Sequence, residues 1–222
     1  MCFAPEADLV AGVVVTAIGL DTLRRATRPE LVPLAALPLV FGVHQLIETL
    51  VWWHQRGEVP DCVGEPATWL YALIALSVVP VLVPVAFHRA GVIRSAPVGR
   101  ALIGAGVVSG TILLLTLLLG TMHATIDGHH INYHVGTPWV GFTLGLYIVA
   151  TCAPGLVSDT RPLRIFGATN LVVVAFLIWL AQSAVVSLWC VWAAVSSVLI
   201  NLYVRRRLTE SRPASRETSD AL

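Results

Sequence analysis

The residues best suited to chemistry lie in one apolar segment, in which His44, Gln45 and Glu48 interrupt a hydrophobic run that starts at Leu31. Because residues four apart share one face of a helix, His44 and Glu48 project together, with Gln45 and Trp52 beside them. An ionisable side chain within a lipid-embedded helix has to face protein or trapped water, and it marks a functional site by default. We therefore expect Glu48 to be the central residue of the site, as a ligand-binding group or as a catalytic one.

A second polar stretch, residues 122–135, predicts a β-hairpin, because Asp127-Gly128 is a strong two-residue turn signal between short alternating runs. The expected register is set by three pairs: Ile126 with His129, Thr125 with His130, and His123 with Asn132. Side chains then alternate between two faces, of which the polar one carries His123, Thr125, His130, Asn132 and His134. The apolar face should lie on the helices, and it carries Met122, Ala124, Ile126, His129, Ile131 and Tyr133.

These residues allow a metal-binding interpretation, because neutral imidazole and carboxylate groups are ligands of zinc, iron and copper. The candidate metal ligands are His44, Glu48, His123, His130 and His134. No dense ligand motif such as HExxH is present. Two other interpretations therefore stay open: histidines that hydrogen-bond a ligand or line a proton path, and a solvated structural hairpin. For a ligand-binding site the candidates are Gln45, Trp52, Trp53 and Tyr133.

The composition indicates a membrane protein. The chain has 222 residues, of which 56% are hydrophobic and 12% charged, with a mean hydropathy of +0.79. A single soluble core could not use so much apolar surface. The net charge of +1 argues against a nucleic-acid partner. All 14 basic residues are arginine, and the absence of lysine excludes a retinal Schiff base.

The fold class expected is an all-α integral membrane protein with seven transmembrane helices and a short extracytoplasmic hairpin. Each apolar segment is long enough to cross about 30 Å of hydrocarbon. The segments are residues 7–23, 31–54, 67–87, 99–121, 137–156, 163–181 and 183–204. The short turn around residues 182–183 leaves an alternative with six crossings and a re-entrant pair. The first segment is not expected to be a signal peptide, because Glu6 and Asp8 replace the basic n-region.

Arginine placement predicts the orientation. Of the 14 arginines, 13 follow the first, third, fifth or seventh segment, and only Arg56 lies on the other side. By the positive-inside rule, the amino terminus is outside and the carboxyl terminus cytoplasmic. We expect a transmembrane domain over residues 1–208 and a disordered cytoplasmic tail over residues 209–222.

With this orientation, all seven tryptophans map to the outer half, as an interfacial belt or as the walls of a pocket. Cys2 and Cys62 are both expected outside, where a disulfide between them would form in an oxidising environment. Alternatively, removal of Met1 would leave Cys2 with its thiol and amine together, as a ligand or nucleophile.

Other polar and small residues are interpreted as structural. Asp21 is within helical reach of Arg25. Pro80 and Pro84 should kink their helix or leave carbonyls free. Asn170 is a candidate donor between helices. A close helix approach is expected at Gly104, Gly106 and Gly110.

Several motifs together give a resemblance to a family of uncharacterised bacterial multi-pass membrane proteins. They are Met1-Cys2-Phe3, Leu37-Pro38-Leu39, Gln45-Leu46-Ile47-Glu48 with Trp52, Val79-Pro80, and Gly128-His129-His130-Ile131 with Tyr133. The chain departs from the family's usual Met-Cys-Phe-Ser-Ala opening at Ala4-Pro5. The resemblance implies an architecture and the positions Cys2, Gln45, Glu48, His130 and Tyr133, and it implies no activity.

The sequence therefore predicts a protein of the bacterial cytoplasmic (inner) membrane whose partners are the lipid bilayer and a small ligand from the extracytoplasmic side. The leading interpretation is a ligand-binding or sensing module, in which Glu48 and the tryptophans recognise a ligand, including a cationic one. Its short cytoplasmic loops would require a partner protein for signalling. The alternative is an intramembrane metal-dependent enzyme, a hydrolase or oxidoreductase acting on a lipid-like substrate with zinc or another transition metal. A proton-coupled transporter is the third.

Overall fold

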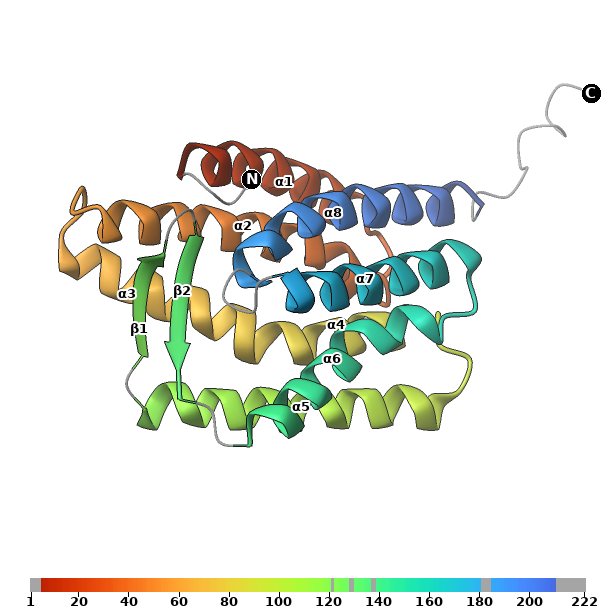
Figure 1. Ribbon diagram of the computed structural model, residues 1–222. Helices are drawn as coiled ribbons and strands as arrows, with labels where there is room; N and C mark the ends of the chain where they lie inside the picture. Colours follow the sequence, from red (N-terminus) through yellow and green to blue (C-terminus); the bar gives the residue numbers. More distant parts are fainter. Residues whose placement is uncertain (1–4, 121, 128–129, 137–138, 181–184, 211–222) are drawn as a thin grey trace, which may run out of the picture.

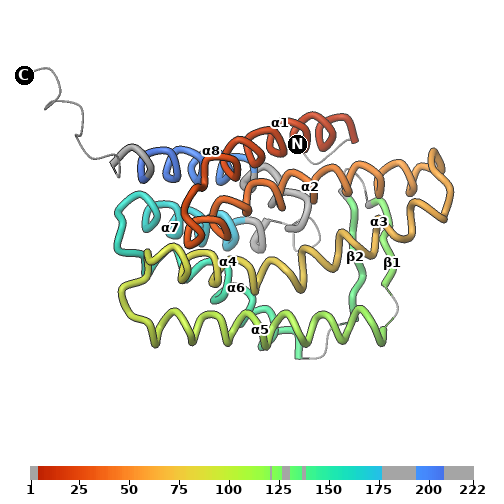
Figure 2. Tube along the Cα trace, turned by 180° about the vertical axis from the view of Figure 1, so that it is seen from behind, coloured from red at the N-terminus to blue at the C-terminus, as the bar shows by residue number. Residues whose placement is uncertain are grey.

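The computed structural model describes residues 5–120, 122–127, 130–136, 139–180 and 185–210. Its helices lie side by side along one long direction, with α1 and α5 at opposite edges (Figures 1 and 2). A two-stranded hairpin crosses one end of the helices. The elements are α1 (Pro5–Arg25), α2 (Val32–Gln55), α3 (Asp61–Leu73), η1 (Ile74–Val78), α4 (Val79–Arg89), α5 (Ala96–Leu119), β1 (Met122–Asp127), β2 (His130–Val135), α6 (Val140–Leu156), α7 (Arg161–Leu180) and α8 (Val185–Glu210).

Each of the seven predicted apolar segments is helical, with α3, η1 and α4 forming one continuous segment. Within the described ranges, three helical segments are long and apolar enough to cross a membrane: α2 with 24 residues, α3 to α4 with 29, and α5 with 24. These lengths exceed the roughly 20 residues that a crossing needs. The chain is therefore consistent with a membrane protein. Seven crossings stay a prediction, and the tail after residue 210 lies outside the described residues.

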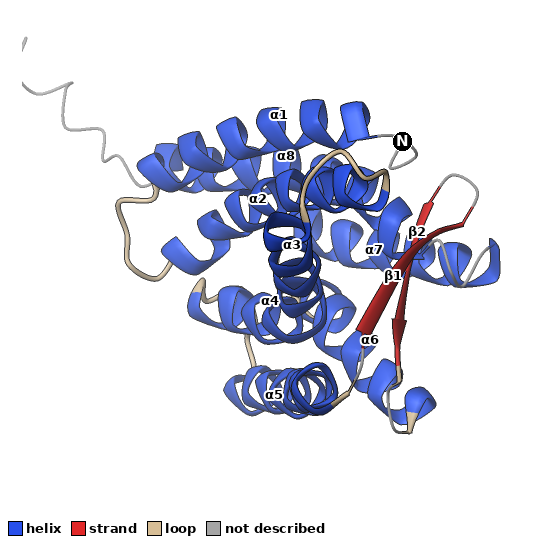
Figure 3. Cartoon of the chain, turned by 90° about the vertical axis from the view of Figure 1, so that its left-hand side faces the viewer, coloured by secondary structure: helices blue, strands red, loops and turns tan. Residues whose placement is uncertain are grey.

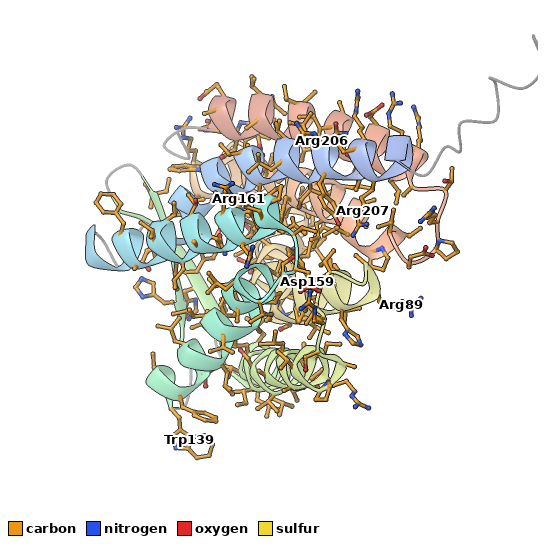
Figure 4. The ribbon with its side chains drawn as sticks, turned by 90° about the vertical axis from the view of Figure 1, so that its right-hand side faces the viewer. Arg89, Trp139, Asp159, Arg161, Arg206 and Arg207 are labelled. Carbon is orange, nitrogen blue, oxygen red and sulfur yellow. The ribbon has the colours of Figure 1, made fainter. Side chains whose placement is uncertain are left out.

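The helices alternate in direction, so the connections gather at two ends of the molecule. One end holds the hairpin and the start of α1, and we call it the hairpin end (Figure 3). The other holds the turns at residues 26–31, 90–95 and 157–160 and the end of α8, and we call it the arginine end. Figure 4, viewed from that end, labels Arg89, Arg161, Arg206 and Arg207 with Asp159. Arg94 joins two of these turns, because its Nε lies 3.4 Å from Oδ1 of Asp159.

Helices α1 and α2 pack with their backbones almost in contact. A Cβ atom added to Gly19 would lie 2.9 Å from Cβ of Leu39, and one added to Gly42 would lie 2.7 Å from Cα of Thr16. Small residues allow such an approach between apolar helices. The contacts step together along both helices: Gly12 with Leu46, Thr16 with Gly42, and Gly19 with Leu39. The two helices therefore share a defined antiparallel register.

The π-helical turn η1 bends the path between α3 and α4. Pro80 has no N–H to give to the preceding turn, and the hydroxyl of Tyr147 on α6 donates to the carbonyl of Ala75 instead, at 2.8 Å. The predicted effect of Pro80 on neighbouring carbonyls is thus seen directly. Helix α5 packs closely here, since a Cβ on Gly110 would lie 2.7 Å from the Ser77 carbonyl oxygen, whereas Gly104 faces open space.

The hairpin forms as predicted, but its register is shifted: each β1 residue faces a β2 residue two positions later than predicted. The structure pairs Asp127 with His130 and Ile126 with Ile131, rather than Ile126 with His129. The other pairs are Thr125 with Asn132, Ala124 with Tyr133, His123 with His134, and Met122 with Val135. Because the shift spans an even number of residues, every side chain keeps its predicted face.

Candidate functional site

The polar face of α2, which we define as His44, Gln45, Glu48 and Trp52, is buried in the half of the molecule nearest the hairpin end. Glu48 is 0% exposed and Gln45 1%. These four residues fall on neighbouring positions of the helix surface, as their spacing predicts. A buried carboxylate and amide in an apolar helix form a polar centre that tertiary packing has to satisfy.

Three aromatic rings from three elements form a column beside this face. The His44 ring stacks on Tyr71 of α3, with centroids 4.0 Å apart, and Tyr71 stacks on Tyr133 of β2 at 4.7 Å. Nε2 of His44 also lies 3.2 Å from the Tyr71 carbonyl oxygen. The column connects the hairpin to the buried polar face of α2. Two predicted site residues, His44 and Tyr133, are thus brought together through Tyr71, which sequence reasoning missed.

Asp8 is a second buried carboxylate that sequence reasoning did not assign to the site. Its side chain is 1% exposed, and it lies on the face of α1 that carries Gly12. Extending the register of α1 and α2 by one turn beyond Gly12 places Asp8 level with Leu50 of α2. Asp8 and Glu48 therefore lie within one helical turn of each other in depth, on two helices in contact.

The hairpin turns His123 and His134 away from the polar face of α2. Ile131 is 0% exposed and packs with Val51, Trp52 and Tyr71, with Tyr133 beside them. His123 and His134 lie on the opposite, exposed face of the hairpin. The described candidate ligands are thus divided, with His44 and Glu48 buried on α2 and the two hairpin histidines on the exposed face. Within the described part of the chain, no three His, Cys, Asp or Glu side chains form a group that could hold a metal ion; the His130 side chain is outside that part.

The predicted disulfide between Cys2 and Cys62 falls partly outside the described residues. Cys62 is an exposed free thiol near the start of α3, and Cys2 lies outside the described residues.

The tryptophans do not behave as one set. Trp52 is buried and has the Arg56 guanidinium 5.6 Å from its ring centroid, whereas Trp53 is half-buried and Trp139 exposed. Trp139 lies far from the labelled arginines in Figure 4. The ring of Trp52 therefore belongs to the buried site, and that of Trp139 suits an interfacial position. The side chains of Trp179, Trp189 and Trp192 lie outside the described residues.

A second polar cluster lies near the arginine end. The Asn201 amide donates to the Thr22 hydroxyl at 2.7 Å and to the Asp21 carboxylate at 3.1 Å. The same carboxylate accepts from Arg205 at 2.7 Å and from Arg25 at 2.8 Å, which confirms the predicted Asp21–Arg25 pair.

A cavity of about 30 Å³ lies one helical turn further inside, with room for about two water molecules. Its polar lining consists of Thr151, Asn170 and Ser196. The predicted donor Asn170 bonds Sγ of Cys152 on α6, at 3.3 Å.

No curated protein and no solved structure matches the chain significantly. The family of unknown function DUF6629 matches residues 1–216, nearly the whole chain. That family carries no assigned activity, in agreement with the resemblance drawn from the motifs. The buried carboxylates, the ring column and the hairpin all lie within the matched residues, and the chain belongs to this family of unknown function, DUF6629.

Proposed function

We propose that the protein is a multi-pass membrane protein that binds a small cationic ligand at Asp8 and Glu48, entering from the hairpin end. The observation that carries the proposal is the placement of two carboxyl groups, each at most 1% exposed, at nearly the same depth on helices α1 and α2. The positive-inside rule predicts a cytoplasmic position for the arginine end, so the hairpin end faces the outside of the membrane.

A buried site that contains two carboxyl groups favours a positively charged ligand. Removing a carboxylate from water is costly, and a cation bound beside it offsets that cost. Two such groups within one helical turn increase the preference for positive charge, because each repels the other when both are ionised. Gln45 and the Trp52 ring lie on the same face of α2 as Glu48, and they supply an amide oxygen and a π surface for a cation.

The surface charge at the hairpin end also favours the approach of a cation. Among the residues that the structure describes, Arg56 is the only arginine at this end, and its guanidinium lies 4.0 Å from the Glu6 carboxylate. Exposed carboxylates outnumber arginine at this end, and they are Glu6, Glu58, Asp61 and Glu65. A surface with an excess of negative charge raises the local concentration of cations. The arginine end has the reverse balance, so a cation is attracted to one end of the molecule alone.

Thermal unfolding of the purified protein in detergent tests the proposal. The probes are sodium, tetramethylammonium and spermidine, each at constant ionic strength. A ligand at 100 times its dissociation constant stabilises the native state by about 2.7 kcal/mol, which raises the midpoint by several degrees. We expect a shift with one probe in the wild type and its loss in Glu48→Gln and Asp8→Asn. The matched control Glu30→Gln, at an exposed position in the turn at the arginine end, should keep the shift. No shift with any probe, or an equal shift in Glu48→Gln, would contradict the proposal.

A cation- or proton-coupled transporter is the second candidate, and one observation favours it. Besides Gln45, the helices bury polar side chains nearer the arginine end, namely Ser197, Asn201 and Thr22, of which the last two are hydrogen-bonded. Buried polar groups within a helix bundle mark ion or proton pathways. Proteoliposomes with an internal pH-sensitive dye distinguish the two functions. Cation-driven proton movement that depends on Glu48 supports transport, whereas binding without flux supports the ligand-binding module. A module that signals would act through a partner protein at the cytoplasmic turns.

A further inference from the structure

We propose that His123 and His134 form a two-histidine site for a divalent transition metal on the exposed face of the hairpin. This site is separate from the buried carboxylates, because it lies on the face of the hairpin that points away from α2. It takes only two of the five metal ligands that the sequence suggested, and it involves neither His44 nor Glu48.

The register of the hairpin carries the proposal. His123 of β1 stands directly opposite His134 of β2, so their Cβ atoms are about 5 Å apart, as in any directly opposed antiparallel pair. Bonds of about 2.0–2.1 Å from imidazole nitrogen to metal allow two such side chains to reach one ion. In the register predicted from the turn signal, His123 faced Asn132 instead, and the histidine pair did not exist.

A polar neighbour holds one of the two rings on this face. Nε2 of His134 lies 3.3 Å from Oγ1 of Thr125, the residue two positions after His123 on β1. Both histidines are exposed, so a hydrated ion reaches them without any opening of the bundle. The Thr125 hydroxyl can accept a hydrogen bond from the Nε2–H of His134, which leaves Nδ1 of that ring as the metal ligand.

The opposite face fixes the hairpin in place. Ile131 is fully buried, and Tyr133 stacks on Tyr71 with 17° between the ring planes. His134 follows Tyr133 directly, so the stack on Tyr71 also fixes the backbone position of His134. A pair of ligands on an anchored hairpin loses little conformational entropy on binding a metal, which favours affinity.

Imidazole ligands suit Zn²⁺, Cu²⁺ and Ni²⁺, in contrast to the oxygen ligands that Mg²⁺ and Ca²⁺ require. Two protein ligands leave the remaining coordination positions to water or to a small external ligand. The site is therefore exchangeable, and it differs from a closed structural zinc site with four protein ligands.

Titration calorimetry of the full-length, tag-free protein in detergent with Zn²⁺ alone tests this site. We expect one Zn²⁺ per chain in the wild type and at least tenfold weaker binding in His123→Ala and in His134→Ala. Asn132→Ala is the matched control, because it alters the same hairpin and keeps both imidazoles, and its affinity should be unchanged. Unchanged Zn²⁺ affinity in the His123→Ala/His134→Ala double variant, or no binding by the wild type, would overturn the proposal.

A second measurement needs no variant. Zn²⁺ should slow the modification of both His123 and His134 by diethylpyrocarbonate in the wild-type protein, as read by peptide mass spectrometry. Equal modification rates with and without Zn²⁺ would overturn the proposal, even if the alanine variants fail to fold.

Discussion

The close packing of α1 on α2 leads to a prediction about Gly42. Replacing Gly42 with Ala adds a Cβ atom 2.5 Å from Oγ1 and 2.7 Å from Cα of Thr16. Carbon atoms in ordinary contact are about 3.5–4.0 Å apart, so the helices have to separate by about 1 Å. The Cα atom belongs to the backbone of α1 and cannot rotate away as a side chain would.

The size of the effect follows from two opposing terms. Overpacking of this kind costs about 1–3 kcal/mol. Alanine is favoured over glycine within a helix by about 1 kcal/mol, which offsets part of the cost. We expect Gly42→Ala to lower the free energy of unfolding by about 1 kcal/mol. The loss is greater if α1 cannot shift, because the overpacking cost is then near the upper end of its range. The same change at Gly104, where nothing lies within 4 Å, should raise the free energy by up to about 1 kcal/mol.

Reversible unfolding in mixed micelles of detergent and SDS measures both variants against the wild type. Gly42→Ala should also weaken cation binding, since movement of α1 displaces Asp8 relative to Glu48, whereas Gly104→Ala should leave binding unchanged. The reasoning is refuted if Gly42→Ala is as stable as Gly104→Ala, because the two differ only in the space around the new methyl group.

Three further predictions concern other parts of the fold. Tyr147→Phe removes the hydroxyl that donates to the Ala75 carbonyl, and it should cost about 1 kcal/mol in chemical unfolding; an unchanged stability would show that the π-helical turn does not depend on this bond. Tyr133→Leu removes the stack on Tyr71, worth about 0.5–1.5 kcal/mol beyond buried area, and should speed hydrogen exchange in residues 122–135 selectively; uniform exchange changes would argue against a local anchor. A periplasmic reporter enzyme fused after Leu208 should be inactive, because the positive-inside rule predicts a cytoplasmic position for the arginine-rich end, and an active fusion would reverse the orientation.

The helices could be predicted from the sequence because each apolar run is long and ends at charged or turn-forming residues. The burial of Glu48 could be predicted because an ionisable side chain within such a run has to face protein. What could not be predicted was the orientation of the whole helix toward its neighbours. The column through Tyr71 depends on how α3 packs on α2, and a single sequence does not encode that packing as a local pattern.

Asp8 was missed although the sequence carried a signal for it. Its acidic side chain appeared only as evidence against a signal peptide, yet it shares a helical stripe with Gly12, Gly19 and Thr22. A stripe of small and polar residues along an apolar helix indicates a buried interface. An acidic residue in that stripe is therefore expected to be buried, which makes it a candidate for the site.

The hairpin shows where the turn signal and the observed pairing disagree. The Asp-Gly signal favours a turn centred on those two residues, but the observed pairing places Ile126 opposite Ile131. That register sets Ile126 directly opposite Ile131, and both registers keep Ile131 on the face that packs against α2 and α3. The alternation of the sequence therefore predicted which side chains face the helices, whereas the turn signal did not predict which residues pair across the two strands.

Infrared difference spectroscopy of the protein in lipid vesicles tests the central claim most directly, because it observes the carboxyl groups themselves. The spectrum is recorded with and without the cation that stabilises the wild type. Binding at Asp8 and Glu48 predicts a cation-induced change in the carboxyl stretching region that is lost in Glu48→Gln and reduced in Asp8→Asn. The same change in both variants, with the exposed control Glu30→Gln also unaltered, would show that the cation binds elsewhere and would contradict the account.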